Sequence, residues 1–169
     1  MSLSKILQVQ YLDSENFNNM KTIYFTTTIE ADPQKVYDLM LGHDTYREWT
    51  KPFSPTSGIK GNWEEDSKMF FTSTDQDGLE AGMISMVDKN IPAEIVIIRH
   101  IGMFNNIGEL YEGEMIDNWK NALEVYRFKK IDGKTELICS VEVSADEDAN
   151  MFDESWPQAL RLLKEICEK

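Results

Sequence analysis

The sequence contains few of the residues that usually build a catalytic centre, a metal site or a cross-linked fold. Its 169 residues include only two cysteines and two histidines. Cys139 and Cys167 do not have Cys-x-x-Cys spacing, so we expect two buried free thiols rather than a disulfide or a metal site. There is no glycine-rich phosphate loop, no Gly-x-Ser-x-Gly elbow and no His/Cys zinc spacing. We therefore predict no metal, no cofactor and no assigned catalytic residue.

Basic residues are also scarce, with 17 against 30 acidic ones, which gives a formal net charge of −13 and a pI near 4.5. A chain of this charge repels phosphate backbones and anionic lipid surfaces, so nucleic acid is excluded as an expected partner. No stretch approaches the ~20 apolar residues of a membrane-spanning helix, and the first residues contain no continuous apolar run. We expect a soluble, cytoplasmic protein without membrane insertion.

The chain is predicted to form one main domain. Its length and its 41% hydrophobic content suit a single sizeable core, and no Pro/Gly/Ser-rich linker divides it. Residues 1–20 are polar and rich in asparagine, and we interpret them as an N-terminal extension, either an edge strand or a flexible arm. The domain is expected to span residues 21–169.

Two short helices are predicted after the first strand. The extended segment Thr22–Ile29 leads into Asp32, whose carboxylate can cap a helix, and into Pro33, which suits the first helical position because it needs no N–H donor there. Gly42 is expected to end this helix. A second helical turn is predicted over Thr45–Trp49.

The middle of the chain is predicted to consist of antiparallel strands. Asp77-Gly78 and Asp132-Gly133 are typical of tight hairpin turns, because these residues adopt positive φ angles readily. A third hairpin is expected to turn over residues 88–92. Residues 52–58 and 102–118 are predicted to be irregular, the latter as a loop or irregular strand at the mouth of the sheet. The predicted strands are Lys68–Thr74, Leu79–Val87, Ala93–Met103, Asn121–Lys130 and Thr135–Val143.

A long amphipathic helix is predicted at the C-terminus. Its apolar residues recur at spacings of three and four, which places them on one helical face. Pro157 removes a donor and crowds the preceding turn, so we expect either a kink there or a helix proper that begins at Trp156. The predicted buried face comprises Phe152, Trp156, Ala159, Leu160, Leu163, Ile166 and Cys167.

The two histidines and one acidic turn are the remaining candidates for chemistry. His43 follows Gly42, where helix capping or exposure is expected. His100 lies in an apolar strand, and a lone strand histidine is more often structural than a base. Its neighbour Arg99 should face the opposite side of the sheet, so at most one of the two can enter an interior cavity. The turn Asp75–Glu80 echoes part of a calcium loop but lacks the third acidic position, so we interpret it as a hairpin turn.

Several motifs together resemble one known superfamily. These motifs are Asp32-Pro-x-x-Val-Tyr, Trp49-Thr50, Gly61-x-Trp63, Asp77-Gly78, Gly82, His100-Ile-Gly, Trp119, Glu124-x-Tyr126 and Trp156-Pro-x-Ala-Leu. From about Thr22 to Glu168 the chain resembles the START-like (SRPBCC, Bet v 1-like) superfamily. Within that superfamily it is similar to the bacterial branch related to the C-terminal domain of the activator of heat-shock protein 90 ATPase.

The resemblance implies an α+β helix-grip fold, in which a six- or seven-stranded curved antiparallel sheet surrounds the C-terminal helix. Nine methionines and 18 aromatic residues, the latter the sum of eight Phe, six Tyr and four Trp, could then line an apolar cavity. We expect non-catalytic binding of a small apolar or amphipathic molecule between sheet and helix. The ligand-binding candidates are Trp49, Phe53, Trp63, Phe70, Ile84, Met86, Ile97, Arg99, His100, Met103, Tyr111, Trp119, Tyr126, Trp156 and Leu160.

Two alternatives remain open at this point. One is an enzyme of the cyclase or hydrolase type, in which Arg99, His100, Glu80 or Tyr111 would polarise or protonate a substrate. The other is an interaction module for a chaperone or another protein, which the resemblance to the ATPase activator implies.

Overall fold

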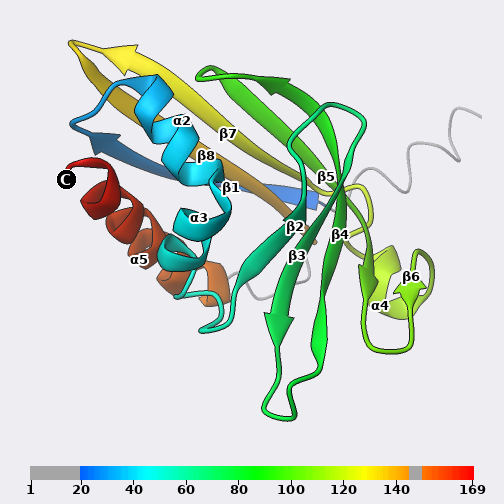
Figure 1. Cartoon of the computed structure of the whole chain (residues 1–169). Helices are drawn as coiled ribbons and strands as arrows, with labels where there is room; N and C mark the ends of the chain where they lie inside the picture. The colour runs from blue at the N-terminus through cyan, green and yellow to red at the C-terminus, as the bar shows by residue number, and fades with distance from the viewer. Residues whose placement is uncertain (1–19, 145–149) are drawn as a thin grey trace, which may run out of the picture.

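A curved antiparallel sheet wraps around the C-terminal helix α5 in the computed structural model, which describes residues 20–144 and 150–169 (Figure 1). Helices α2, α3 and α5 lie on one side of the sheet, and β6 and α4 extend from the far end of β5. The helices are α2 (Pro33–Leu41), α3 (His43–Trp49), α4 (Glu114–Asp117) and α5 (Asn150–Cys167). The strands are β1 (Met20–Ile29), β2 (Gly58–Gly61), β3 (Lys68–Thr74), β4 (Glu80–Ile91), β5 (Ile95–Phe104), β6 (Glu109–Leu110), β7 (Leu123–Ile131) and β8 (Lys134–Ser144).

The sheet follows the order β1-β8-β7-β5-β4-β3-β2, with β6 paired to β5 outside this path. These eight strands confirm the α+β helix-grip architecture but exceed the six or seven expected. The two strands without a sequence prediction, β2 and β6, have only four and two residues. Strands this short carry too few alternating positions to be distinguished from loops.

The predicted start of the first helix is confirmed. The side chain of Asp32 accepts a hydrogen bond from the backbone N–H of Gln34 at 3.1 Å, and Pro33 occupies the first turn of α2. Gly42 ends α2 and immediately precedes α3, which begins at His43. The chain therefore makes two short helices directly after β1, as expected.

The hairpin turns agree only in part with the prediction. Asp132 and Gly133 both have positive φ angles, of 48° and 78°, and form a two-residue turn. The hairpin that contains Asp77 and Gly78 is longer, because Thr74 pairs with Glu80 and five residues lie between them. The Asp75 carboxylate stabilises this turn by accepting hydrogen bonds of 2.9 Å from the backbone N–H groups of Asp77 and Leu79. The turn predicted over residues 88–92 was wrong, since β4 continues to Ile91 and the chain reverses around Ala93, whose φ is 60°.

Helix α5 runs from Asn150 to Cys167 with Pro157 inside it, so a helix that begins at Trp156 is the wrong alternative. Pro157 lines a surface groove between β1 and α5. The apolar face is confirmed, with Trp156, Leu160 and Leu163 fully or almost fully buried. In the described part of the chain no helix is long and apolar enough to cross a membrane.

Buried apolar side chains form a main core between the sheet and the three helices. Among the described residues four other buried apolar side chains, those of Ile84, Ile116, Ala122 and Val125, do not belong to that cluster. Ile84 and Val125 alternate along their strands with residues that face α5, so they point to the opposite side of the sheet. The sheet is therefore covered on both faces near β4, β5 and α4.

The end of α5 is attached to the edge strand β1. The ammonium group of Lys164 donates to the backbone oxygen of Thr28 at 2.6 Å, and the carboxylate of Glu168 accepts from the backbone N–H of Glu30 at 2.8 Å. This backbone hydrogen bond and the neighbouring Lys164 hold the pKa of Glu168 below its ordinary value. The C-terminal end of α5 thus occupies backbone groups at the end of β1, which is paired with β8 on one side only among the described residues.

Cys139 and Cys167 are free and buried, as predicted. Burial raises the pKa of Cys139 well above its usual value and that of Cys167 from 9.0 to about 11. A thiol whose folded pKa is raised stabilises the fold below the unfolded pKa, and this contribution is lost as the pH rises through the folded pKa. For Cys167 the free energy of unfolding should therefore fall between about pH 9 and 11.

We expect the native protein to react with 5,5′-dithiobis(2-nitrobenzoate) at pH 8 at least about 100-fold more slowly than the protein unfolded in guanidinium chloride, because the thiolate is the reactive form. The measurement is the absorbance released by native and unfolded samples, in which the unfolded chain supplies the reference of two reactive thiols. Rapid reaction of both thiols in the native protein would contradict the burial described here.

Candidate functional site

A chain of four polar side chains lies on the inner face of the sheet, where most neighbours are apolar. Ser85 and His100 are opposite one another on β4 and β5, and the Ser85 hydroxyl shares a hydrogen bond of 2.8 Å with Nδ1 of His100. Nε2 of His100 lies 3.4 Å from a carboxylate oxygen of Glu124 on β7. The other oxygen of that carboxylate accepts a hydrogen bond from the Tyr126 hydroxyl. We call Ser85, His100, Glu124 and Tyr126 the polar chain.

Strand register explains why these side chains face α5. Glu124 and Tyr126 are two residues apart on β7 and so share a face, and Tyr126 pairs with Cys139 and Val96, both in the main core. A bulge in the β4–β5 pairing near Ser85 brings the serine opposite His100. Among the described residues no buried side-chain nitrogen or oxygen lacks a hydrogen-bond partner.

Two buried phenols on this side of the sheet, Tyr126 of the polar chain and Tyr46, have raised pKa values. Burial, followed by the charge of Glu124, raises the pKa of Tyr126 well above its ordinary value. The same two causes, in the same order, raise the pKa of Tyr46, which lies in the main core. The protonated Tyr126 hydroxyl therefore donates its hydrogen bond to Glu124.

A series of aromatic rings runs from the polar chain to α5. Phe71 is in edge contact with the His100 ring at 6.4 Å between centroids, and Tyr46 lies 6.1 Å from Phe71. Tyr46 packs at 5.2 Å on Trp49, which lies 6.3 Å from Trp156 of α5. The inner surface thus presents an aromatic wall beside a hydrogen-bonding group.

Burial differs between the two ends of this inner surface. Close to the C-terminal half of α5 the side chains of Ile29, Leu137 and Leu163 are completely buried. Near the N-terminal half, several side chains that pack on the core remain half-buried, and the Glu124 side chain is 17% exposed. The half-buried apolar residues of this end are Ile23, Phe25, Phe71 and Phe152. We call this end, together with the polar chain and the aromatic wall, the inner site.

The structure divides the 15 ligand-binding candidates between two faces of the sheet. The residues on the inner face or on the helices and loops that cover it are Trp49, Phe53, Trp63, His100, Met103, Tyr126, Trp156 and Leu160. On the strands, the residues that alternate to the other face are Phe70, Ile84, Met86, Ile97 and Arg99. Tyr111 and Trp119 lie next to β6 and α4, where Tyr111 contacts Lys68 and Glu109.

Arg99 and Glu80 both lie away from His100. Arg99 makes a two-pronged ion pair with Asp88 on the outer face, at 2.9 and 3.0 Å, which confirms that it and His100 face opposite sides. Glu80 forms an ion pair with Lys60 of β2. An acid–base site that combines His100 with Arg99, Glu80 or Tyr111 is therefore not assembled.

Sequence reasoning did not select Ser85, Glu124, Phe25, Phe71 or Phe152 for the site. Only the Glu124-x-Tyr126 spacing indicated that a further residue belongs to the site, because residues two apart on a strand share a face, so Glu124 lies beside Tyr126. Ser85 could not be found in this way, since the bulge that places it opposite His100 is a property of the paired strands.

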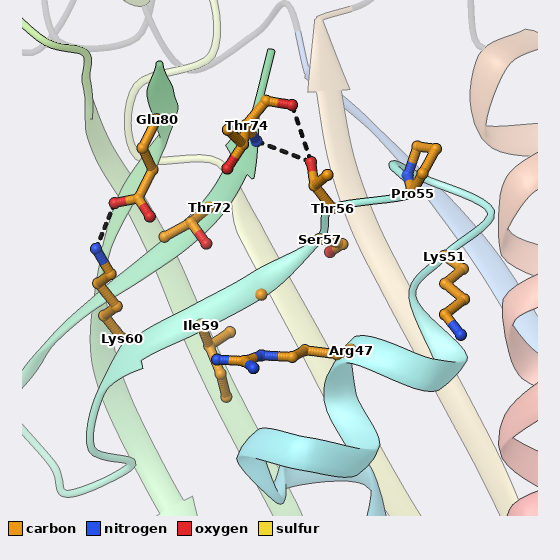
Figure 2. A pocket seen from close by; sticks show the side chains of 11 residues that line it. Arg47, Lys51, Pro55, Thr56, Ser57, Ile59, Lys60, Thr72, Thr74 and Glu80 are labelled. Carbon is orange, nitrogen blue, oxygen red and sulfur yellow. Dashed lines mark hydrogen bonds and ion pairs between the residues drawn. The ribbon is translucent and has the colours of Figure 1, made fainter. Parts of the chain in front are cut away.

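Two depressions are also present on the surface of the described residues, and the first of them shares Phe25 with the inner site. One is a groove of about 440 Å³ between β1 and α5, lined by Phe25, Thr27, Pro157, Leu160 and others. The second, of about 320 Å³, lies at the β2 edge beside the end of α3 and contains Arg47, Lys51 and several hydroxyl groups (Figure 2). We call it the β2 pocket.

Comparison with known proteins identifies the class of fold. No protein-family model matches the sequence, and a search of curated protein sequences finds no similar one. Solved structures do match. An uncharacterised protein from Rhizobium leguminosarum superposes with a TM-score of 0.64 at 14% identity and covers 88% of this chain and 95% of its own. A protein from Chromobacterium violaceum gives 0.63 at 15% identity, with 88% and 97% covered.

A third match is the Aha1 dimer from Colwellia psychrerythraea, with a TM-score of 0.61, 20% identity and coverage of 88% of this chain and 96% of that one. At these identities the similarity shows the fold alone. The chain has a helix-grip fold.

Proposed function

We propose that the protein binds a small amphipathic molecule at the inner site. The observation that carries this proposal is the presence of a partly exposed carboxylate–imidazole pair, Glu124 and His100, directly beside half-buried aromatic side chains. Small-molecule sites typically combine apolar and aromatic walls with a few convergent polar groups. Glu124 and His100 would hold the polar end of the ligand, and Phe71 and the neighbouring rings its apolar part.

The arrangement of charges favours a ligand with a hydroxyl or another donor group. The Glu124 carboxylate accepts hydrogen bonds and already takes one from Tyr126, while its exposed part remains open to a second donor. An acidic ligand would meet this carboxylate in a molecule that already has a net charge of −13. We therefore infer a neutral ligand.

The proposal can be tested with 1-naphthol, a neutral aromatic alcohol, through quenching of the intrinsic tryptophan fluorescence. We expect Phe71→Leu to weaken binding by about tenfold, because it removes ring contact at the inner site. Phe70→Leu is the matched control, since Phe70 is the adjacent residue of β3, is also half-buried and faces the opposite side. Glu124→Gln should weaken binding to a similar extent through the polar end.

Native mass spectrometry of the gently purified protein gives an independent measurement of any small molecule that it carries. Equal affinities of the two phenylalanine variants for 1-naphthol would overturn the assignment of the inner site. Absence of both a copurified molecule and any 1-naphthol binding would overturn the proposed function itself.

A second candidate is acid–base catalysis on the bound molecule, favoured by the Ser85–His100 hydrogen bond and by the Glu124 carboxylate 3.4 Å from the other ring nitrogen of His100. Ser85 is completely buried, so it would orient the imidazole and would not act as a nucleophile. Hydrolysis of 1-naphthyl acetate that is lost in Glu124→Gln and retained in Phe70→Leu would support this candidate. The chaperone-linked role remains a prediction from the resemblance alone.

A further inference from the structure

Arg47 and Lys51 are two basic residues of this acidic protein that line the same pocket. In the described part of the chain eight lysines and arginines form ion pairs with carboxylates. Neither Arg47 nor Lys51 has an ion-pair or side-chain hydrogen-bond partner among those residues, although both line the β2 pocket. Two uncompensated positive charges therefore share one depression in a molecule with a net charge of −13.

The β2 pocket is built from elements distant in the sequence. Arg47 extends from α3 across β2, with its Nε 3.7 Å from where a Cβ on Gly58 would lie (Figure 2). Thr72 and Thr74 reach it from β3, on the face opposite to that of Phe71. The β2 pocket is therefore separate from the inner site.

Hydrogen-bond donors in the pocket remain available. The Thr56 hydroxyl is engaged with the backbone of Thr74, to which it donates at 3.0 Å and from which it accepts at 2.8 Å. The hydroxyls of Ser57 and Thr72 have no partner among the described residues and line the same pocket. Lys60 is held by Glu80 at the rim, so the single carboxylate of the lining is already neutralised.

We propose that the β2 pocket binds the oxyanion of a small organic molecule, such as a phosphate monoester or a carboxylate. The Arg47 guanidinium offers a planar set of donors that matches two oxygens of such a group, and the hydroxyls of Ser57 and Thr72 add further donors, while the Lys51 side chain points away from Arg47 at the rim (Figure 2). The volume of about 320 Å³ exceeds that of a bare ion, and Pro55 and Ile59 supply apolar contacts for the attached organic part.

The test is a titration of ¹⁵N-labelled full-length protein with phenyl phosphate, followed by the amide resonances of Gly58 and Ser57, with phenol as the uncharged probe. We expect both resonances to shift with phenyl phosphate and not with phenol. Arg47→Gln should weaken the affinity at least about tenfold, the usual loss for a charge-assisted hydrogen bond.

Lys89→Gln is the matched control because Lys89 is an exposed lysine without an ion pair in the described part of the chain. It lies nine residues along β4 from Glu80, or about 30 Å. Gly58→Ala provides a second test without a change of charge, since the added Cβ would lie 3.2 Å from the Thr72 hydroxyl and 3.7 Å from Arg47. It should weaken phenyl phosphate binding by occupying the pocket floor.

The proposal is overturned if phenyl phosphate leaves Gly58 and Ser57 unshifted, or if Arg47→Gln and Lys89→Gln bind it equally well. Similar affinities for phenyl phosphate and benzoate would assign the site to oxyanions in general and support the proposal. The result is independent of 1-naphthol binding at the inner site, so either conclusion can fail without the other.

Discussion

Replacement of Trp156 by alanine is expected to lower the free energy of unfolding by about 3–5 kcal/mol, the range for a large aromatic residue removed from a core. The Trp156 ring lies 5.5 Å from that of Phe25, 5.2 Å from that of Phe53, 6.3 Å from that of Trp49 and 6.4 Å from that of Tyr126. It therefore joins α5 to β1, to β7 and to the segment that follows α3. Its loss would leave a cavity that these rings cannot close without moving the helix.

Urea unfolding followed by circular dichroism measures the loss in the free energy of unfolding, and thermal unfolding should show a fall in the melting temperature of about 10 °C for a domain of this size. Tyr24→Ala is the control, because Tyr24 is also an aromatic residue beside α5 but is 65% exposed. It should change the stability by less than about 0.5 kcal/mol. A loss below about 1 kcal/mol for Trp156→Ala, with an unchanged urea dependence, would contradict the packing described for the N-terminal half of α5.

Gly82→Ala is expected to be the most damaging substitution that adds a single methyl group, with a loss of about 3 kcal/mol, at the upper end for overpacking. An added Cβ at this position would lie 1.8 Å from the backbone oxygen of Phe71 and 3.1 Å from the ring of Phe104. The oxygen belongs to the neighbouring strand β3, so relief requires the two strands to separate. No side-chain rotation can provide it.

The measurement is again equilibrium unfolding, combined with hydrogen exchange of the β3 and β4 amides. Gly58→Ala serves as the comparison because its Cβ would meet only a side-chain hydroxyl at 3.2 Å, which can rotate away. It should cost much less than Gly82→Ala. Comparable losses for the two variants would show that the close approach of β3 to β4 at Gly82 is easily relaxed.

The elements that could be predicted from the sequence are those specified by local chemistry. Asp32 and Pro33 define a helix start through one carboxylate and one missing donor, and both act within four residues. The apolar period of α5 repeats over 18 residues, which is long enough to outweigh the contrary signal of Pro157. Such signals do not depend on the rest of the molecule.

The candidate site was predictable only in part because its composition depends on strand register. Phe70 and Phe71 are chemically equal in the sequence, yet a shift of one residue decides which of them faces α5. Register here is determined by pairing across strands and by the irregularity near Ser85. The sequence therefore indicates an aromatic lining but does not show which of the candidate residues face α5. The Ser85–His100 contact could not be predicted, because it depends on how β4 and β5 pair.

The attachment of α5 to β1 also covers part of an edge of the sheet. An exposed edge strand is a template on which a second chain can add a strand, and natural sheets commonly cover or charge such edges. Here Lys164 and Glu168 bring a positive and a negative charge to the backbone of Thr28 and Glu30. The C-terminal end of α5 therefore covers backbone groups on which a second chain could add a strand, in addition to its contribution to the core.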